Sequence, residues 1–237
     1  MSKFRITKRD KSLLLKLSEL GLMSTRQIEQ LVFSGILLGT VLRRLRKLKS
    51  LKLIAKEAGV HGGPAIWVLS PKGGKEVGIT EIYGSMNRNQ LEHEILISEI
   101  GGLLDQAQVL LRWKPGFITK RDVLKRHKNR NSFQTDVIPD ALFVGRGVSG
   151  TSPIFALELE LNLKSKRRYE KVFGTYSNKK GVQYLWYIVR HPKQGERLLQ
   201  IWNETAHSSN GPVQFVWSDL NEIKKCPRSI YTNLTTD

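Results

Sequence analysis

The feature that most constrains the fold is the alternation of large apolar residues with other residue types from Phe155 to Asn162. Successive side chains of a β-strand point to opposite faces, so this period of two predicts a strand. Glu158 and Glu160 fall on the same face of that strand, and their carboxylates share a direction. The sequence therefore predicts a sheet that carries two acids close together on one surface.

A second strand and a turn are predicted just upstream. Residues 137–144 are rich in β-forming types, and residues 145–152 have the Gly and Ser composition of a turn. An antiparallel hairpin centred near Ser149 places Asp140 opposite Glu158. Cross-strand neighbours have Cβ atoms roughly 4.5–5.5 Å apart. Asp140 and the two glutamates are therefore expected within reach of one hard divalent cation.

Three carboxylates this close repel one another unless a cation, a proton or open solvent relieves the charge. We therefore expect a Mg²⁺ (or Mn²⁺) site at Asp140, Glu158 and Glu160. Such a cation lowers the pKa of a bound water and offsets charge on a phosphate under attack, and Glu160 or a nearby Lys would orient the nucleophile. The alternative interpretation is that the acids line an exposed, solvated strand face.

The hairpin sits in a longer series of predicted elements. Apolar residues recur at helical spacing in three segments, and three other segments are β-rich. In chain order these are a helix at 89–107, a strand at 109–113, the hairpin, a helix at 164–177, a strand at 182–189, a helix at 196–206 and a strand at 213–217. This order resembles the PD-(D/E)XK nuclease core, a restriction-endonuclease-like α+β or α/β fold with a mixed sheet flanked by helices.

That resemblance implies roles for particular residues. The family's two metal-binding acids match the Asp and Glu that face each other across the predicted hairpin. The position two residues later usually holds Lys, whereas this chain has Glu160, as in a Glu-x-Glu variant. Lys164 or Lys166 would then supply the missing cation. Glu94 matches an extra acidic metal-binding position of several members, although a surface glutamate is the plainer interpretation.

The N-terminal third predicts a second unit. Helical patterns cover residues 7–20, 24–32 and 38–49, and two strands follow at 53–57 and 65–69, joined by a Gly-rich turn. Three helices followed by a two-stranded wing is the order of a winged helix-turn-helix. In such domains the third helix enters the major groove of DNA.

The third predicted helix has an apolar side and a basic side. We expect its apolar residues to face the core: Leu38, Val41, Leu42, Leu45 and Leu48. We expect its polar residues to contact DNA together with one residue of the second helix and one at the wing tip: Thr40, Arg43, Arg44, Arg46, Lys47, Arg26 and His61. The alternative interpretation is a solvated basic face without a partner.

The overall charge agrees with a nucleic-acid partner. The chain has a formal net charge of +18 and a pI near 10.1. Basic residues neutralise phosphates and release counterions, so we expect double-stranded DNA as the partner. The density of positive charge peaks between Arg112 and Arg130, a run that includes Lys120, Arg121, Lys125 and Arg126. Residues 116–132 fit either a basic flap or a disordered arm.

Length and composition predict two domains. Residues 1–80 form the winged helix, 81–88 the linker and 89–237 the nuclease-like domain. The single cysteine, Cys226, excludes an internal disulfide and agrees with a reducing cytoplasm. Apolar runs long enough to span a bilayer are absent from the sequence, so we expect no membrane partner. A homodimer is a further expectation.

Several short motifs are spread over most of the chain: Ile6–Leu14, Ser24–Ile28, Ile66–Gly73, Leu91–Glu94, Pro139–Asp140, Glu158–Glu160 and Arg168–Tyr169. With these motifs the chain resembles the replication-relaxation family of plasmid and mobile-element proteins. The resemblance implies a bacterial DNA-binding protein in plasmid replication or mobilisation, with a relaxase or another mobilisation protein as partner. Two hypotheses follow: a Mg²⁺-dependent DNA endonuclease targeted by its winged helix, or an inactive sequence-specific binder such as a replication accessory factor or repressor.

Overall fold

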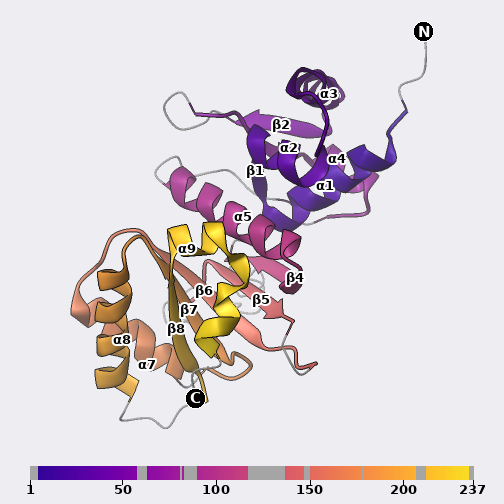
Figure 1. Ribbon diagram of the computed structural model, residues 1–237. Coiled ribbons are helices and arrows are strands. Elements are labelled where there is room, and N and C mark those ends of the chain that lie inside the picture. The colour runs from indigo at the N-terminus through magenta and orange to yellow at the C-terminus, as the bar shows by residue number, and fades with distance from the viewer. Residues whose placement is uncertain are drawn as a thin grey trace. The chain divides into compact units, whose positions relative to one another are not determined.

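Two separate β-sheets organise the chain in the computed structural model (Figure 1). The structure describes residues 5–57, 63–80, 82, 90–116, 137–146, 150–177, 179–206 and 212–234. The α+β class predicted from the sequence is confirmed. Contacts divide the chain into two compact units, residues 1–102 and 103–237, and the division falls within helix α5 (Leu91–Gln106). Apart from Ile82, the predicted linker lies outside the described residues.

The first unit has three helices followed by a β-hairpin, the order predicted for a winged helix. Its sheet is antiparallel, with strand order β1-β3-β2. Its elements are α1 Lys8–Leu20, β1 Leu22–Ser24, α2 Thr25–Val32, α3 Leu38–Ser50, β2 Ile54–Glu57, β3 Ile66–Leu69 and α4 Pro71–Glu76. The wing tip between β2 and β3, with His61, lies outside the described residues.

Hydroxyl side chains fix where helices of this unit begin. Thr7, Ser24 and Ser70 each accept a hydrogen bond from the backbone N–H three residues later, which satisfies one of the free donors at a helix start. In α1 and α2 the bond is reciprocated by Asp10 and Gln27, giving two capping boxes. Local sequence therefore determines the starts of α1, α2 and α4.

The core of the first unit follows the predicted apolar stripes with one exception. The leucines of α1 at 13, 14, 17 and 20 are buried, as are Val41, Leu45 and Leu48 of α3. Leu38 was expected to face the core, but the structure leaves it 46% exposed. The physical reason is its position in the first turn of α3, where helical spacing alone does not guarantee a packing neighbour.

The second unit is a five-stranded mixed sheet in the order β4-β5-β6-β7-β8. The first three strands pair antiparallel, and β6, β7 and β8 pair parallel. Parallel neighbours need crossover connections, which α7 and α8 provide. The elements are β4 Leu110–Pro115, β5 Ala141–Gly145, β6 Ile154–Glu160, α7 Lys166–Ser177, β7 Tyr184–Val189, α8 Pro192–Ala206, β8 Gln214–Asp219, α9 Leu220–Lys225 and a 3₁₀ helix Pro227–Leu234.

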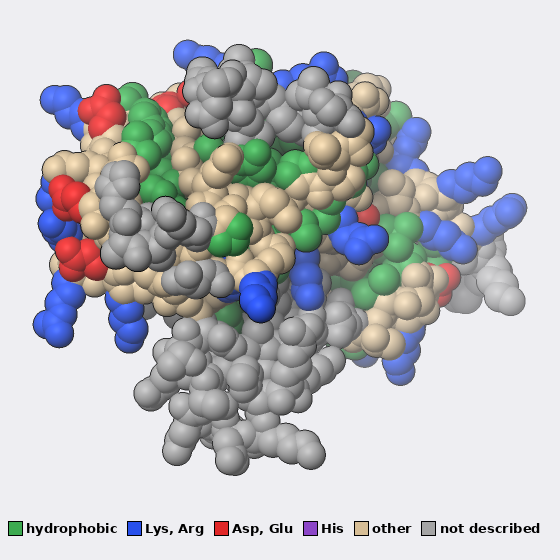
Figure 2. All heavy atoms as spheres, turned by 90° about the horizontal axis from the view of Figure 1, so that it is seen from below, with side chains coloured by type: hydrophobic (Ala, Val, Ile, Leu, Met, Phe, Trp, Pro, Cys, Tyr) green, Lys and Arg blue, Asp and Glu red, His purple; other side chains and the backbone are tan. Residues whose placement is uncertain are grey.

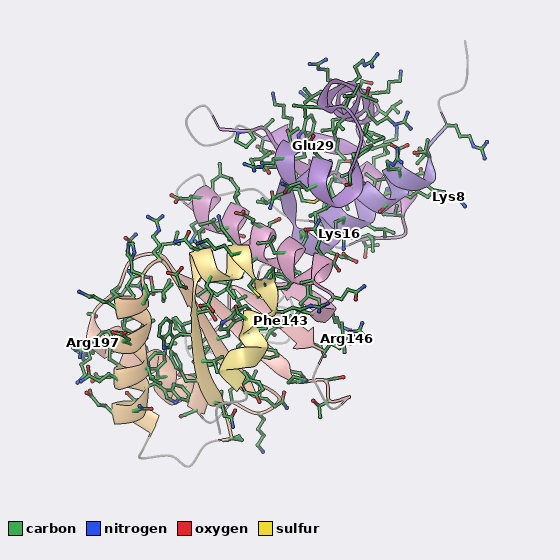
Figure 3. The ribbon with its side chains drawn as sticks, viewed as in Figure 1. Lys8, Lys16, Glu29, Phe143, Arg146 and Arg197 are labelled. Carbon is green, nitrogen blue, oxygen red and sulfur yellow. The ribbon has the colours of Figure 1, made fainter. Side chains whose placement is uncertain are left out.

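Helices α7 and α8 cover one face of this sheet (Figure 1). Their aromatic residues pack on the face formed by alternate residues of β6 and β7, and Phe173 lies at the centre of this cluster. Arg197 projects from the outer side of α8 (Figure 3). The acidic residues of β6 belong to the covered face, so α7 decides what the carboxylates contact.

Candidate functional site

The hairpin of β5 and β6 has the predicted register. Ala141 pairs with Leu157, and each further step along β5 moves one residue back along β6, so the hairpin is centred on position 149. Asp140 directly precedes β5 and is therefore opposite Glu158. One carboxylate oxygen of Asp140, Oδ2, accepts a hydrogen bond from the backbone N–H of Leu159 at 2.8 Å. The structure thus brings Asp140 and Glu158 together at one end of the hairpin.

Two tyrosines of α7 bind the two glutamates of β6. The hydroxyl of Tyr169 donates to Glu160 Oε2 at 2.8 Å, and the hydroxyl of Tyr176 donates to Glu158 Oε1 at 2.8 Å. Residues seven apart share one side of a helix, and residues two apart share one face of a strand, so the two pairs form side by side. The sequence predicts the helix that carries both tyrosines but does not reveal these hydroxyl bonds.

Of the two lysines predicted near the acids, only Lys164 contacts them. Its Nζ forms an ion pair with Oε1 of the buried Glu160. Lys166 is the first residue of α7 and is exposed; its Nζ lies 2.7 Å from Oε2 of Glu204 on α8. Lys166 is therefore directed toward the helical layer, and Lys164 is the cation beside the carboxylates.

The environment of Glu158 favours its protonated form. Burial under α7, followed by repulsion from Asp140 and Glu160, raises the pKa of Glu158 well above its ordinary value of 4.5. The hydrogen bond from Tyr176 and the charge of Lys179 oppose this shift without cancelling it. Burial and the neighbouring Glu158 also raise the pKa of the Tyr176 hydroxyl, so that group stays a donor at neutral pH.

Replacing Glu158 by glutamine is expected to stabilise the protein at neutral and alkaline pH. A carboxyl with a raised pKa in the folded state favours folding when both states are protonated, and this advantage is lost as the pH rises from the unfolded pKa through the folded pKa. Melting temperatures of Glu158→Gln and wild type should therefore agree near pH 4 and diverge toward pH 8, with the variant higher. Glu170→Gln, on the exposed side of α7, is the control and should change little. A wild type more stable than the variant at pH 8 would contradict the shift.

The acids do not form a complete metal-ligand group. Within the described ranges, no set of three or more His, Cys, Asp or Glu side chains is arranged so that it could hold a metal ion. Both carboxylate oxygens of Glu160 are engaged, by Lys164 and Tyr169. Glu94 lies in the first turn of α5, in the first unit. Asp140 and Glu158 are thus the two predicted ligands that the fold brings face to face.

Among the described residues of the first unit that were predicted to contact DNA, all but one face outward. Thr40, Arg43, Arg46 and Lys47 of α3 are exposed, as is Arg26 of α2. Arg43 also donates a hydrogen bond to the Thr40 hydroxyl at 3.2 Å. Lys and Arg side chains are more frequent than Asp and Glu on the molecular face in Figure 2. The described polar surface of α3 is basic because the helix contains five Lys or Arg residues and no acid.

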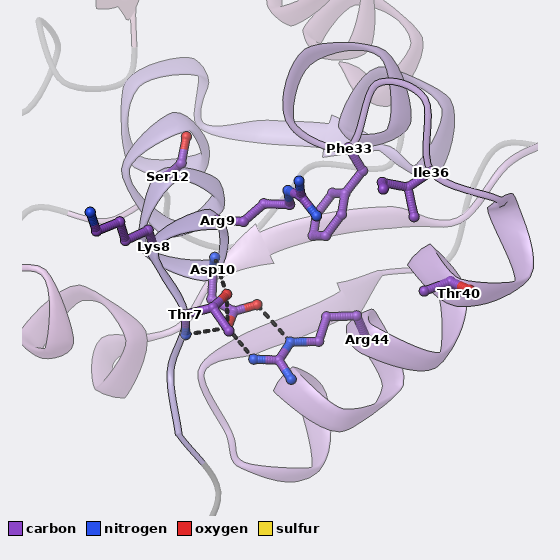
Figure 4. A pocket seen from close by; sticks show the side chains of 9 residues that line it. All are labelled: Thr7, Lys8, Arg9, Asp10, Ser12, Phe33, Ile36, Thr40 and Arg44. Carbon is purple, nitrogen blue, oxygen red and sulfur yellow. Dashed lines mark hydrogen bonds and ion pairs between the residues drawn. The ribbon is translucent and has the colours of Figure 1, made fainter.

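Arg44 is the exception, and the expectation that it faces outward is wrong. Its guanidinium forms a two-pronged ion pair with Asp10, whose side chain is fully buried (Figure 4). Burial alone would raise the pKa of Asp10, but hydrogen bonds from Arg44 and Thr7 outweigh it and hold the pKa below its ordinary value. Arg44 therefore joins α3 to the start of α1. A helical pattern cannot reveal such a partner because Asp10 lies 34 residues away in the sequence.

A pocket of about 720 Å³ opens beside this ion pair (Figure 4). The guanidinium carbon of Arg9 lies 5.8 Å from the centre of the Phe33 ring within it. The one acid among the residues that line the pocket, Asp10, is paired with Arg44, so the net charge of the lining is positive. The lining residues are Thr7, Lys8, Arg9, Asp10, Ser12, Phe33, Ile36, Thr40 and Arg44.

Comparison with known proteins identifies the family of this chain. No curated protein and no solved structure is similar at a significant level. The family model described as replication-relaxation matches residues 14–184. The chain belongs to the replication-relaxation family. Membership suggests a role in the replication or relaxation of plasmids or mobile elements.

The replication-relaxation match covers both α3 and the hairpin that carries Asp140 and Glu158. It extends from within α1 through α3 and the hairpin of β5 and β6 to the first residue of β7. It leaves out α8 and β8. Four predicted basic contacts, Lys120, Arg121, Lys125 and Arg126, lie outside the described residues. None of the helices in the described parts of the chain has the length and apolar composition to cross a bilayer.

Proposed function

We propose that this replication-relaxation protein binds double-stranded DNA through α3 of its first unit. The observation that carries the proposal is the exposed cationic side of α3, formed by Arg43, Arg46 and Lys47 with no acid in the helix. An α-helix fits the major groove of B-DNA, and flanking Lys and Arg neutralise phosphates. In this role the protein acts as a replication or mobilisation accessory factor or a repressor, with a relaxase or a second copy as further partners.

The contacts inside the first unit support this use of α3. The ion pair between Arg44 and Asp10 holds α3 against the start of α1, so the exposed residues of α3 are presented in a defined direction. The same pair neutralises the buried carboxylate of Asp10, which would otherwise repel phosphates. The hydrogen bond between Arg43 and Thr40 restricts the arginine before binding, which reduces the entropy lost on contact.

A triple variant tests the proposal. Arg43→Ala, Arg46→Ala and Lys47→Ala together should weaken DNA binding on the order of 100-fold, because each charge-assisted contact contributes about 1 kcal/mol or more. The measurement is a fluorescence-anisotropy titration of duplex DNA at several salt concentrations. The salt dependence should also become shallower, by about one unit of slope per lost phosphate contact.

The matched control removes the same charge elsewhere. Lys193→Ala, Lys224→Ala and Lys225→Ala change three exposed lysines of α8 and α9 in the second unit. This control should lower affinity far less than the α3 variant, since it alters net charge but not the proposed contact helix. Equal losses in both triple variants would mean that binding depends on total charge and would overturn the role of α3.

A second candidate function is metal-dependent cleavage of DNA at the hairpin of β5 and β6. The register that sets Asp140 opposite Glu158, together with the ion pair between Lys164 and Glu160, supports it. A bound Mg²⁺ (or Mn²⁺) would activate a water and offset charge on the phosphate. Asp140 and Glu158 would hold the cation, Tyr176 would orient Glu158, and Lys164 would balance the charge of Glu160. Incubation with supercoiled plasmid tests cleavage, because a single cut changes its mobility.

A further inference from the structure

Two exposed leucines stand at the start of α3. Leu37 is 82% exposed and Leu38 is 46% exposed. A turn closed by a hydrogen bond from Ile36 N–H to the Phe33 carbonyl at 2.9 Å leads into them, with Gly35 in the left-handed region at φ 76°. The leucines are thus held on a defined turn, although the unit's core does not bury them.

The stability of α3 does not explain why residue 37 is a leucine. Leu37 is the N-cap of α3 and makes no side-chain capping bond. The other helices with described caps in this unit begin at Thr or Ser, which cap well, whereas leucine is among the poorest N-cap residues. Residues that break a local rule without a structural gain are often functional.

The leucines lie at the head of the basic side of α3. Leu37 shares a side of the helix with the exposed Thr40, three residues later, and the Thr40 hydroxyl accepts a hydrogen bond from Arg43. A side chain added at Gly39 would meet no atom within 4 Å, so the backbone there is open to close approach. A ligand of this surface therefore has anionic groups along its length and an apolar group at one end of the contact.

We propose that Leu37 and Leu38 contact thymine methyl groups in the major groove and so determine which DNA sequence is bound. The inference rests on the proposed DNA binding by α3. Phosphates supply the anionic groups, and the C5-methyl of thymine is the apolar group that the major groove presents. In major-groove helices the N-terminal residues contact base edges, which is where these leucines lie. Two leucines at one helix end are a smaller apolar face than a membrane-surface helix presents.

The test compares thymine with uracil, which lacks only the methyl group. A binding site is first selected from random duplex DNA with the wild-type protein. Each thymine in that site is then replaced by deoxyuracil, and affinities are measured by anisotropy. Loss of a contacted methyl should weaken wild-type binding about fourfold at one or more positions. Leu37→Ala with Leu38→Ala should bind both duplexes equally while keeping its affinity for unrelated DNA.

A control variant and the possible outcomes separate the thymine contact from the proposed DNA binding by α3. Leu111→Ala with Leu163→Ala changes two exposed leucines of the second unit and should keep the preference for thymine. Wild-type binding that is equal for thymine and uracil at every position overturns the methyl contact but leaves DNA binding intact. Absence of any duplex binding overturns both. Vesicle binding that depends on the two leucines, with unchanged DNA binding in the variant, would assign the surface to a membrane.

Discussion

Replacing Asp10 by alanine is expected to destabilise the first unit by about 3 kcal/mol, because the change leaves Arg44 without its buried partner. The value is at the lower end of the usual range because the Arg44 side chain remains 27% exposed and can be hydrated. The same carboxylate accepts from the backbone and hydroxyl of Thr7 at 2.7 Å each, so the start of α1 also loses its capping box.

Hydrogen exchange resolved by peptide is the suitable measurement, since it reports the first unit separately from the second. Backbone amides of α1 and α3 should exchange much faster in Asp10→Ala, and those of β7 should not change. Glu19→Ala is the control, because Glu19 forms an exposed pair with Lys16 on the same helix and should cost less than about 1 kcal/mol. Equal exchange in the two variants would contradict a structural role for Asp10.

The lowered pKa of Asp10 gives this prediction a pH dependence. A carboxyl whose folded pKa lies below its unfolded value stabilises the fold above the unfolded pKa, and the contribution is lost as the pH falls through the folded pKa. The difference between wild type and Asp10→Ala should therefore be full at neutral pH and shrink below about pH 4.

If the second unit cleaves DNA, replacing Asp140 by alanine should abolish metal-dependent nicking of supercoiled plasmid. DNA binding, measured by gel shift, should not change. Glu158→Ala should do the same, because Asp140 and Glu158 are the pair that the hairpin sets face to face. Wild type with EDTA is the metal control. Lys166→Ala is the matched variant, since Lys166 pairs with Glu204 on α8 and should nick normally.

The outcomes of this assay distinguish three interpretations of the second unit. Nicking that survives in Asp140→Ala places cleavage elsewhere or in a contaminant. Nicking lost in both acid variants and in EDTA identifies a metal nuclease. A gel shift without nicking in every sample identifies a protein that binds DNA but does not cleave it. The bonds that Tyr169, Tyr176 and Lys164 make to Glu158 and Glu160 agree with that outcome.

Local patterns were sufficient to predict much of the fold. The alternation in β6 and the turn composition before it gave the hairpin and its register, because side-chain period and turn length fix the pairing. The helical patterns beginning at residues 7 and 24 gave the starts of α1 and α2 to within one residue. The helix α9 and the following 3₁₀ helix were missed, since these short elements near the end of the described chain offer too few residues to show a period.

The site was predicted less completely, for a different physical reason. Which carboxylates approach each other follows from one hairpin, whereas the bonds from Tyr169 and Tyr176 depend on how α7 packs across the sheet. Arg44 looked equivalent to Arg43 on the helix, and only the distant Asp10 makes them different. Partners contributed by another element are set by tertiary packing, which a period along one element does not encode.

The two-pronged ion pair between Arg44 and Asp10 matters for any attempt to graft the helices of the first unit into another protein. The guanidinium also donates to the carbonyl of Arg5 at 3.3 Å, and Thr7 holds the acid from the other side. The orientation of α3 therefore depends on Asp10 in the first turn of α1 and on Arg5 and Thr7, which precede that helix. A graft that carried only α2 and α3 into a new host would leave that anchor behind, whereas a graft starting at Arg5 would transfer it.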